Sequence, residues 1–208
     1  EGFVDSSPRN IELTQRVYEA SVDSQVERVV YASSSSIYGS GATNPAARPE
    51  PQPISPYGVS KLVGEQLAHV YRAQGLHITN LRYFTVYGPR QRPDMAMHRM
   101  FEATTPDGPV FVLRGDGQQR REFTYVSDVV TATAAAGFIG EAANATFDVG
   151  GGSSVSLQEV MTLVETLADA AMRMETVVAP AGDPAITVAR TDDAAEILGW
   201  SPKIDLVE

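Results

Sequence analysis

The chain has 208 residues, of which 43% are hydrophobic and 20% charged, enough apolar material for one substantial core, alone or with a smaller lobe. A formal net charge of −10 argues against general binding to nucleic acids or anionic membranes, because both need a positive surface field. The chain contains no cysteine, which excludes disulfides, thiolate metal sites and cysteine nucleophiles.

Two further classes of function find no support in the sequence. The three histidines, His69, His77 and His98, lack a spacing that would bring two of them to one metal ion. No apolar run approaches the roughly 18 residues of a membrane-spanning helix, and the first ten residues lack the pattern of a signal peptide. We therefore expect a cytoplasmic protein without a metal site or membrane anchor.

Helices and strands alternate over the first 88 residues. We predict a helix over 11–21, a strand over 26–32, a loop over 39–56, a helix from 55 to 75 and a strand over 77–82. This order is typical of parallel strands joined by crossover helices. Such sheets bind their ligands at the carboxyl ends of the strands.

Prolines and short segments follow Gly88 and indicate a second, smaller lobe. We predict a strand over 111–113, a turn at Gly115 and Gly117, a strand end at 124, a helix capped by Ser127 and running to 139, a strand over 146–149 and a helix over 156–172. We divide the chain into 1–88, the remaining part of a nucleotide-binding domain, and 89–208, mainly a substrate-binding lobe with some segments returning to the sheet.

Tyr57 and Lys61 form a Y-x-x-x-K pair at the start of the helix that begins near Ser55. Their i, i+4 spacing puts both side chains on one face of the helix. A neighbouring ammonium favours the phenolate form of a tyrosine, which makes Tyr57 a candidate for proton transfer. The alternative is an exposed pair without function, because this pattern occurs by chance on many helices.

Four consecutive serines, Ser33 to Ser36, follow the predicted strand 26–32, where a parallel sheet presents its ligand site. A serine-rich turn that caps its own backbone is the alternative interpretation. The combination with Tyr57 and Lys61 favours a catalytic site.

The segments ASSSSIYG, SPYGVSK and LRYFTVYGP, with 23 residues from Ser34 to Tyr57, resemble the extended short-chain dehydrogenase/reductase family. Its members include sugar-nucleotide epimerases, dehydratases and decarboxylases. The resemblance extends from about Asn10 through REFTYVSD to PAGD and LGWSPK near the end. It implies an α/β fold with a Rossmann-type doubly wound parallel sheet and a smaller C-terminal α/β substrate-binding lobe. It also implies a homodimer, in which the helices near 11–21 and 60–74 form a helix bundle with those of a second copy.

The resemblance also implies a role for individual residues. The catalytic residues would be Ser34, Tyr57 and Lys61, and NAD would contact Asn10, Ser33 and Tyr83 as well as Tyr57 and Lys61. The UDP-sugar substrate would contact Ser35, Ser36, Thr85, Arg92, Phe111, Val112, Leu113, Arg121 and Asp183. Pro180 stands where the family has Arg or Gln, which leaves one nucleotide contact open.

A dinucleotide-binding sheet of this kind starts with a strand, a glycine-rich turn and a helix whose N-terminus binds the pyrophosphate. The sequence opens at a later point, and its dense glycine run, Gly150 to Gly152, lacks the spacing of that turn. We expect roughly 90 further residues, or three βα units, to supply this part of the NAD site. The 208 residues alone are expected to be inactive.

Several residues of these motifs indicate which reaction of the family the protein catalyses. Dehydratases and decarboxylases of the family carry an acidic residue where Ser35 and Ser36 stand, so the sequence favours 4-epimerisation, which needs no second acid. The stretch FTVYGPRQRPDMA resembles UDP-glucuronate 4-epimerases, whereas galactose-type epimerases more often have Asn in place of Thr85. The planar fork of Arg92 suits a carboxylate, and an exposed arginine without function is its alternative.

The predicted function is therefore NAD-dependent conversion of UDP-glucuronate to UDP-galacturonate through a 4-keto sugar. A UDP-glucose/galactose-type 4-epimerase, or another sugar-nucleotide-modifying enzyme of the family, is the first alternative. A non-catalytic NAD-binding scaffold or sensor is an alternative of a different class.

Overall fold

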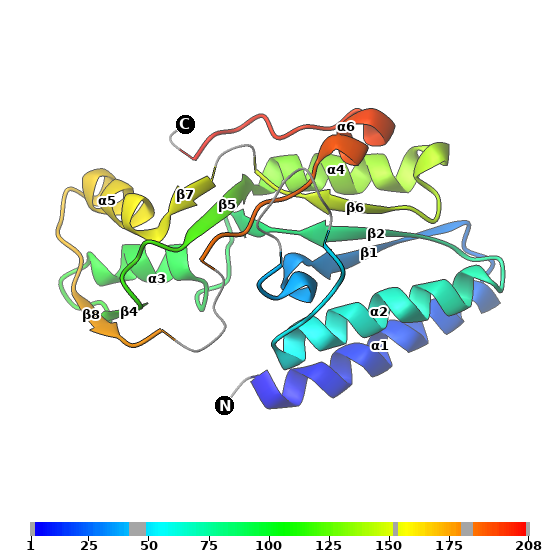
Figure 1. Ribbon diagram of the computed structural model, residues 1–208, viewed down its shortest axis with the longest axis horizontal. Helices are drawn as coiled ribbons and strands as arrows, with labels where there is room; N and C mark the ends of the chain where they lie inside the picture. The colour runs from blue at the N-terminus through cyan, green and yellow to red at the C-terminus, as the bar shows by residue number, and fades with distance from the viewer. Residues whose placement is uncertain (1–2, 42–48, 152–153, 180–184, 207–208) are drawn as a thin grey trace.

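A parallel sheet forms the centre of the computed structural model, which describes residues 3–41, 49–151, 154–179 and 185–206. Strands β1 (Arg28–Ser34), β2 (His77–Tyr83) and β6 (Thr146–Val149) lie in the order β1–β2–β6, all parallel (Figure 1). Because β2 has a strand on each side, residues 78–82 are all buried, the pattern of an inner strand covered on both faces.

Helices cover both faces of this sheet. Helices α1 (Phe3–Asp23) and α2 (Pro56–Arg72) lie side by side on one face, and α4 (Val126–Phe138) lies on the other beside α6 (Asp192–Leu198) (Figure 1). Helix α2 starts at Ser55, whose Oγ accepts the Gly58 N–H at 3.0 Å, with Pro56 in the first helical position. The predicted α/β class, with a doubly wound parallel sheet, is confirmed.

A second group of elements lies beyond the carboxyl ends of β1 and β2 (Figure 1). It contains a sheet of β3 (Thr85–Tyr87), β5 (Arg120–Tyr125) and β7 (Ser154–Ser156), a parallel pair of β4 (Phe111–Arg114) and β8 (Met174–Val177), and helices α3 (Ala96–Ala103) and α5 (Leu157–Ala168). Met100, Phe123 and Val160 lie in its core. The division at residue 88 stays a prediction, although β6, α4 and α6, from later in the chain, belong to the first sheet.

Several boundaries differ from the sequence-based expectation. The prediction of Ser127 as a helix cap is wrong: β5 leads directly into α4, whose N-cap is Tyr125, and Ser127 lies inside the first turn. Helix α5 is capped by Ser156 and ends at Asp169, which adopts left-handed φ and ψ, so the helix does not reach 172. The sequence reading missed α3, β3, β7, β8, α6 and the 3₁₀ turns η1 (Ser35–Tyr38) and η2 (Gly140–Ala142).

Within the described ranges, no helix is both long enough and apolar enough to cross a membrane. The same ranges hold no cluster of three or more His, Asp and Glu side chains arranged to bind a metal ion.

Candidate active site

The serine run lies at the carboxyl end of β1 and continues into η1. Ser34 is 8% exposed and has the extended backbone of an N-cap. Its Oγ accepts the Ser36 N–H at 3.2 Å and donates to Ser36 Oγ at 3.1 Å. The turn therefore caps its own backbone, as the alternative interpretation expected, and the same cap fixes the position of Ser34 Oγ.

Tyr57 and Lys61 occupy the first two turns of α2, next to this serine turn. The Lys61 Nζ lies 5.7 Å from the ring centroid of Tyr57 and 5.4 Å from that of Tyr31, so the ammonium contacts two aromatic faces. It also donates to the carbonyl oxygen of Ala32 at 2.7 Å. Burial lowers the pKa of Lys61, because a less hydrated site disfavours its charged form.

A pocket of about 940 Å³ brings most of the predicted residues together. It lies at the carboxyl ends of β1 and β2, where ligands bind in parallel sheets. Its lining includes Asn10, Ser33, Ser34, Ser35, Ser36, Tyr57, Lys61, Tyr83, Thr85 and Arg92. The sequence reading had not singled out the other lining residues, among them Tyr87, Arg90, Gln91, Asp94 and Val126.

Arg92 lies at the rim of this pocket and already binds a carboxylate. Its Nε and Nη2 donate to the two carboxylate oxygens of Asp94, at 3.0 and 2.9 Å. Both side chains are largely exposed, 74% for Arg92 and 67% for Asp94, so solvent weakens the pair. The Nε and Nη2 of Arg92 are therefore oriented so that together they can bind a planar carboxylate.

Four predicted substrate contacts lie away from the pocket. Phe111 and Leu113 are buried in the core of the second group, and Val112 is half-buried between them on β4. Arg121, on β5, donates through Nη1 to the carbonyl oxygen of Arg120 at 2.8 Å. Asp183 lies outside the described residues. The roles assigned to these five residues stay predictions.

A buried ion pair lies behind the serine turn, and the sequence reading missed it. Glu65 and Arg82 are each 7% exposed, and Arg82 Nη2 lies 2.6 Å from Glu65 Oε2. Two signals could have indicated it. Glu65 follows Lys61 by one helical turn, and Arg82 is a charged residue in a strand that is otherwise buried, where a charge needs a partner.

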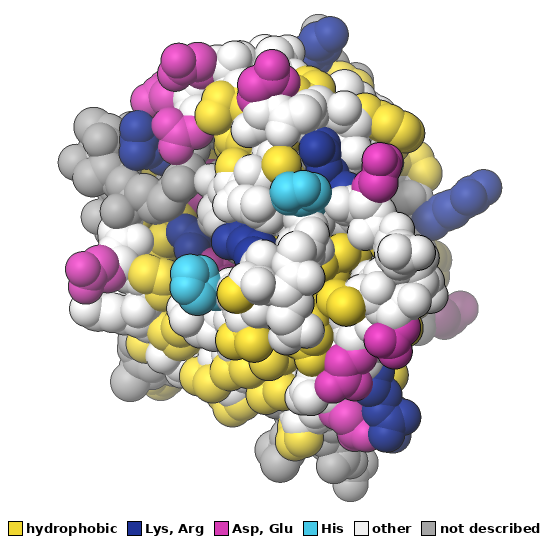
Figure 2. Space-filling view, turned by 90° about the vertical axis from the view of Figure 1, so that its right-hand side faces the viewer, with side chains coloured by type: hydrophobic (Ala, Val, Ile, Leu, Met, Phe, Trp, Pro, Cys, Tyr) yellow, Lys and Arg dark blue, Asp and Glu magenta, His cyan; other side chains and the backbone are white. Residues whose placement is uncertain are grey.

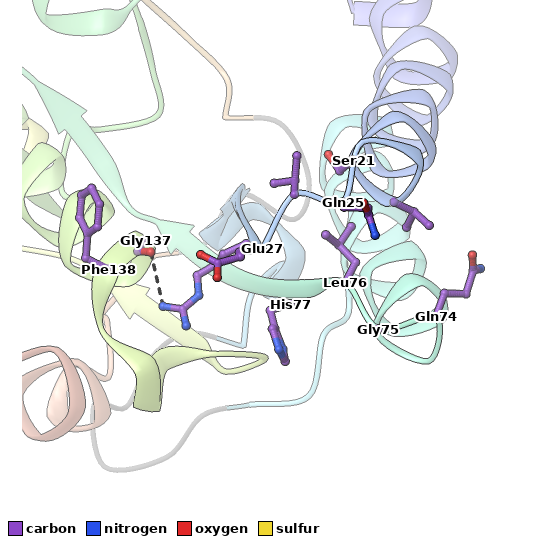
Figure 3. Close-up of a pocket in the computed structure, with 12 residues that line it drawn as sticks. Ser21, Gln25, Glu27, Gln74, Gly75, Leu76, His77, Gly137 and Phe138 are labelled. Atoms are coloured by element: carbon purple, nitrogen blue, oxygen red, sulfur yellow. Dashed lines mark hydrogen bonds between the residues drawn. The ribbon is translucent and has the colours of Figure 1, made fainter.

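A second hollow, of about 650 Å³, lies at the opposite end of the sheet, where β1 and β2 begin (Figure 3). Arg28 donates there to the carbonyl oxygens of Gly137 and Ile139, the last residues around the end of α4. None of the predicted site residues lines this hollow. The pocket at the carboxyl ends is therefore the candidate active site.

Comparison with known proteins shows the family of the chain. Residues 4–150 match the model of the NAD dependent epimerase/dehydratase family. The chain is 40% identical, over 95% of its length, to a Bacillus subtilis protein named uncharacterized UDP-glucose epimerase YtcB, and it spans 62% of that relative.

Two solved structures share the fold over 95% of the chain. One is MoeE5 in complex with UDP-glucose and NAD, with a TM-score of 0.88, 41% identity and 67% of that chain covered. The other is a UDP-glucuronic acid 4-epimerase from Bacillus cereus in complex with UDP-glucuronic acid and NAD, with a TM-score of 0.86, 37% identity and 63% covered. With the matched family model spanning most of its length, this chain belongs to the NAD dependent epimerase/dehydratase family.

Proposed function

We propose that the whole protein is an NAD-dependent 4-epimerase of a UDP-sugar, with UDP-glucuronate as its preferred substrate. One observation carries this proposal: Ser34, Tyr57 and Lys61 line the same pocket at the carboxyl ends of β1 and β2. A hydroxyl, a phenol and an ammonium in one wall suit the transfer of a proton to and from a sugar hydroxyl.

The residues of this wall fit the nicotinamide end of NAD. The serine oxygens can accept, and the Tyr57 phenol and the Lys61 ammonium can donate, hydrogen bonds with the hydroxyls of a ribose, and Asn10 and Tyr83 extend the same wall. Bound NAD would supply the chemistry that the side chains lack, by accepting a hydride from a sugar carbon and returning it. The 208 residues, which span 62% of the length of YtcB, would contribute this half of the site.

The side chains would then divide the proton chemistry. Tyr57 would take the proton of the C4 hydroxyl, and the nearby Lys61 ammonium would favour its phenolate. Ser34 would donate a hydrogen bond to the same sugar oxygen once its O–H turns away from Ser36 Oγ, while its oxygen keeps accepting the Ser36 N–H. Among the described lining residues the one carboxylate is Asp94, and Arg92 binds it; this supports epimerisation over dehydration, which needs a further acid and base.

The experiment is to incubate the whole protein with NAD and, separately, UDP-glucuronate and UDP-glucose, and to identify the products by NMR. We expect conversion to the C4 epimers, with a higher kcat/KM for UDP-glucuronate, and loss of turnover in Tyr57→Phe. NAD binding without turnover of either sugar would favour the scaffold or sensor. A preference for UDP-glucose would favour the UDP-glucose/galactose-type epimerase, which the likeness to YtcB and to MoeE5 with UDP-glucose supports.

Arg92 is proposed to bind the carboxylate of the uronate. A 4-keto uronate is a β-keto acid, which loses carbon dioxide once its carboxylate can turn perpendicular to the plane of the ring carbonyl. An arginine that holds the carboxylate in one orientation would suppress this loss. We expect Arg92→Ala to raise the KM for UDP-glucuronate by about 10- to 100-fold, the value of a charge-assisted hydrogen bond, and to release a UDP-pentose.

Arg90→Ala is the matched control, because Arg90 is an exposed arginine that also lines the pocket. It should leave the product as a hexuronate. Full activity on UDP-glucuronate with no pentose in Arg92→Ala would exclude the carboxylate role.

A homodimer through α1 and α2 is proposed on the exposed apolar side chains of these helices. Leu13 and Val17 on α1 are 53% and 54% exposed, one turn apart, and Val59 and Val70 on α2 are 46% and 52% exposed. Figure 2 shows hydrophobic side chains gathered on the lower part of one end of the molecule, the side on which Figure 1 draws these helices. Val17→Asp should shift the sedimentation of the protein from dimer to monomer.

A cytoplasmic location stays a prediction from the sequence.

A further inference from the structure

The buried carboxylate of Glu65 joins three elements that carry pocket residues. Its Oε1 accepts hydrogen bonds from Ser33 Oγ at 2.6 Å and from Arg82 Nε at 2.9 Å. Its Oε2 accepts one from Arg82 Nη2 at 2.6 Å. The first donor lies at the end of β1, the second at the end of β2, and Glu65 itself lies on α2 one turn after Lys61.

Arg82 extends the network to the serine turn. Its Nη1 donates to the hydroxyl of Tyr38 at 2.6 Å, and its guanidinium carbon lies 5.0 Å from the centroid of that ring. Tyr38 is the last residue of η1, 1% exposed, and donates in turn to Asp148 Oδ1 at 2.7 Å. The guanidinium thus binds α2 and η1 at once, through a rigid planar fork.

Stability alone does not require an ion pair at this place. The cost of removing two charges from water offsets most of their attraction, and apolar side chains of similar volume give buried sites equal or greater stability. A bidentate pair does fix distance and direction, which an apolar contact does not. Ser33 lines the pocket, and Tyr38, Glu65 and Arg82 each lie within four residues of a residue that lines it.

We propose that Glu65 and Arg82 are positioning residues of the candidate active site, which hold the serine turn in register with Tyr57 and Lys61. This inference rests on the proposed function. Through Glu65 the network fixes the rotation of α2, and through Ser33 and Tyr38 it fixes both ends of the turn that contains Ser34. The hydroxyl proton of Ser33 is committed to Glu65, so toward the pocket Ser33 can offer acceptor lone pairs.

The informative variant replaces both charges, Glu65→Leu with Arg82→Met, because either single change leaves a buried charge without its counterion. We expect the double variant to fold, to bind NAD and to keep the KM for its UDP-sugar within about 3-fold. Its kcat should fall by about 10- to 100-fold, since a misplacement near 1 Å has that effect on catalysis. Arg82→Lys should fall between this variant and the wild type, because an ammonium keeps the charge and loses the fork.

The control is Glu12→Gln with Arg16→Gln, which removes an exposed ion pair on α1 (Glu12 62% and Arg16 70% exposed) and should leave kcat unchanged. A wild-type kcat per NAD-binding molecule in the folded double variant would overturn the proposal, and so would a raised KM with kcat intact. If the double variant does not fold, Tyr38→Phe replaces it, since this change keeps the ion pair and removes the link to η1. The same criteria apply, with an expected fall of about 3- to 10-fold in kcat.

A second readout separates this inference from the proposed function. Wild-type protein that turns over no UDP-sugar would refute the proposed function and leave the positioning to be tested by amide hydrogen exchange. The double variant should then exchange faster at residues 33–38 and 57–61, with the rest of the sheet unchanged. Unchanged protection at these two segments would overturn the positioning role.

Discussion

Glu122 offers a test of the buried electrostatics behind the pocket. It lies on β5, is 6% exposed, and accepts the backbone N–H of Ala189 through Oε2 at 2.8 Å. Burial raises the pKa of Glu122 to about 7; the hydrogen bond from Ala189 opposes this shift and the carboxylate of Asp148 adds to it. Replacing Glu122 by Gln keeps the shape and an acceptor oxygen while removing the titration.

The sign of the effect follows from proton binding. Between the ordinary value of 4.5 and about 7, the folded protein holds a proton on Glu122 that the unfolded chain has lost. The free energy of unfolding therefore falls as the pH rises through this window, and the contribution of the protonated carboxyl is complete only below it. At about 1.4 kcal/mol for each unit of pKa, the loss approaches an upper limit of about 3 kcal/mol above pH 7.

The assay is urea unfolding of the wild type and Glu122→Gln at pH 5 and pH 8. Between pH 5 and pH 8 the free energy of unfolding of the wild type should fall by about 2 to 3 kcal/mol more than that of Glu122→Gln. Glu196→Gln, at an exposed position on α6, is the control and should show no such change. A difference between wild type and Glu122→Gln that is the same at both pH values would refute the raised pKa.

Three further substitutions test the packing around the pocket and the second group. In Gly64→Ala the new Cβ would clash with the Tyr31 hydroxyl, so the free energy of unfolding should fall by about 1 to 3 kcal/mol, as for an overpacked core, and the melting temperature with it; an unchanged melting temperature would contradict this contact. Ser156→Ala removes a capping box with Glu159 and should cost about 1 kcal/mol in urea unfolding, whereas a neutral result would show that α5 does not depend on its cap. Tyr31→Leu removes one of the two rings beside the Lys61 ammonium and should lower the pKa of Lys61 further, measured by NMR titration; a rise would refute that role of the ring.

The elements that sequence predicted well are those whose signals lie within a few residues. Ser55 and Pro56 mark the start of α2 because the cap and the fixed φ of proline act inside one helical turn. Residues 77–82 are predicted as a strand and lie in β2, because the turn at Gly75 separates them from the preceding helix and the β-branched Ile78 and Thr79 favour extended backbone. Tyr57 and Lys61 are predicted as a candidate pair for the same reason, a spacing of one turn.

Features that depend on distant partners were missed. Strand β8 is exposed at all four of its residues and exists through its pairing with β4, so no hydrophobic pattern marks it. Ser127 has the right residue type for a cap, yet β5 ends at Tyr125 and α4 begins at the next residue. Tyr125 is therefore the N-cap, and Ser127 lies inside the helix. The pairing of Glu65 with Arg82 joins a helix to a strand across 17 residues of chain, a contact that neither residue announces alone.

The serine run shows why local patterns alone leave function undecided at this site. Capping a turn and serving a reaction were alternatives at the level of sequence, but Ser34 caps η1 with the same Oγ that lines the pocket. The cap fixes the position of Ser34 Oγ, and Ser33 is held by Glu65, so the turn is fixed from both the backbone and the core. In the proposed reaction the Ser34 hydroxyl would meet a substrate oxygen with only its O–H bond left to rotate, which is the physical advantage of building the site on a capped turn.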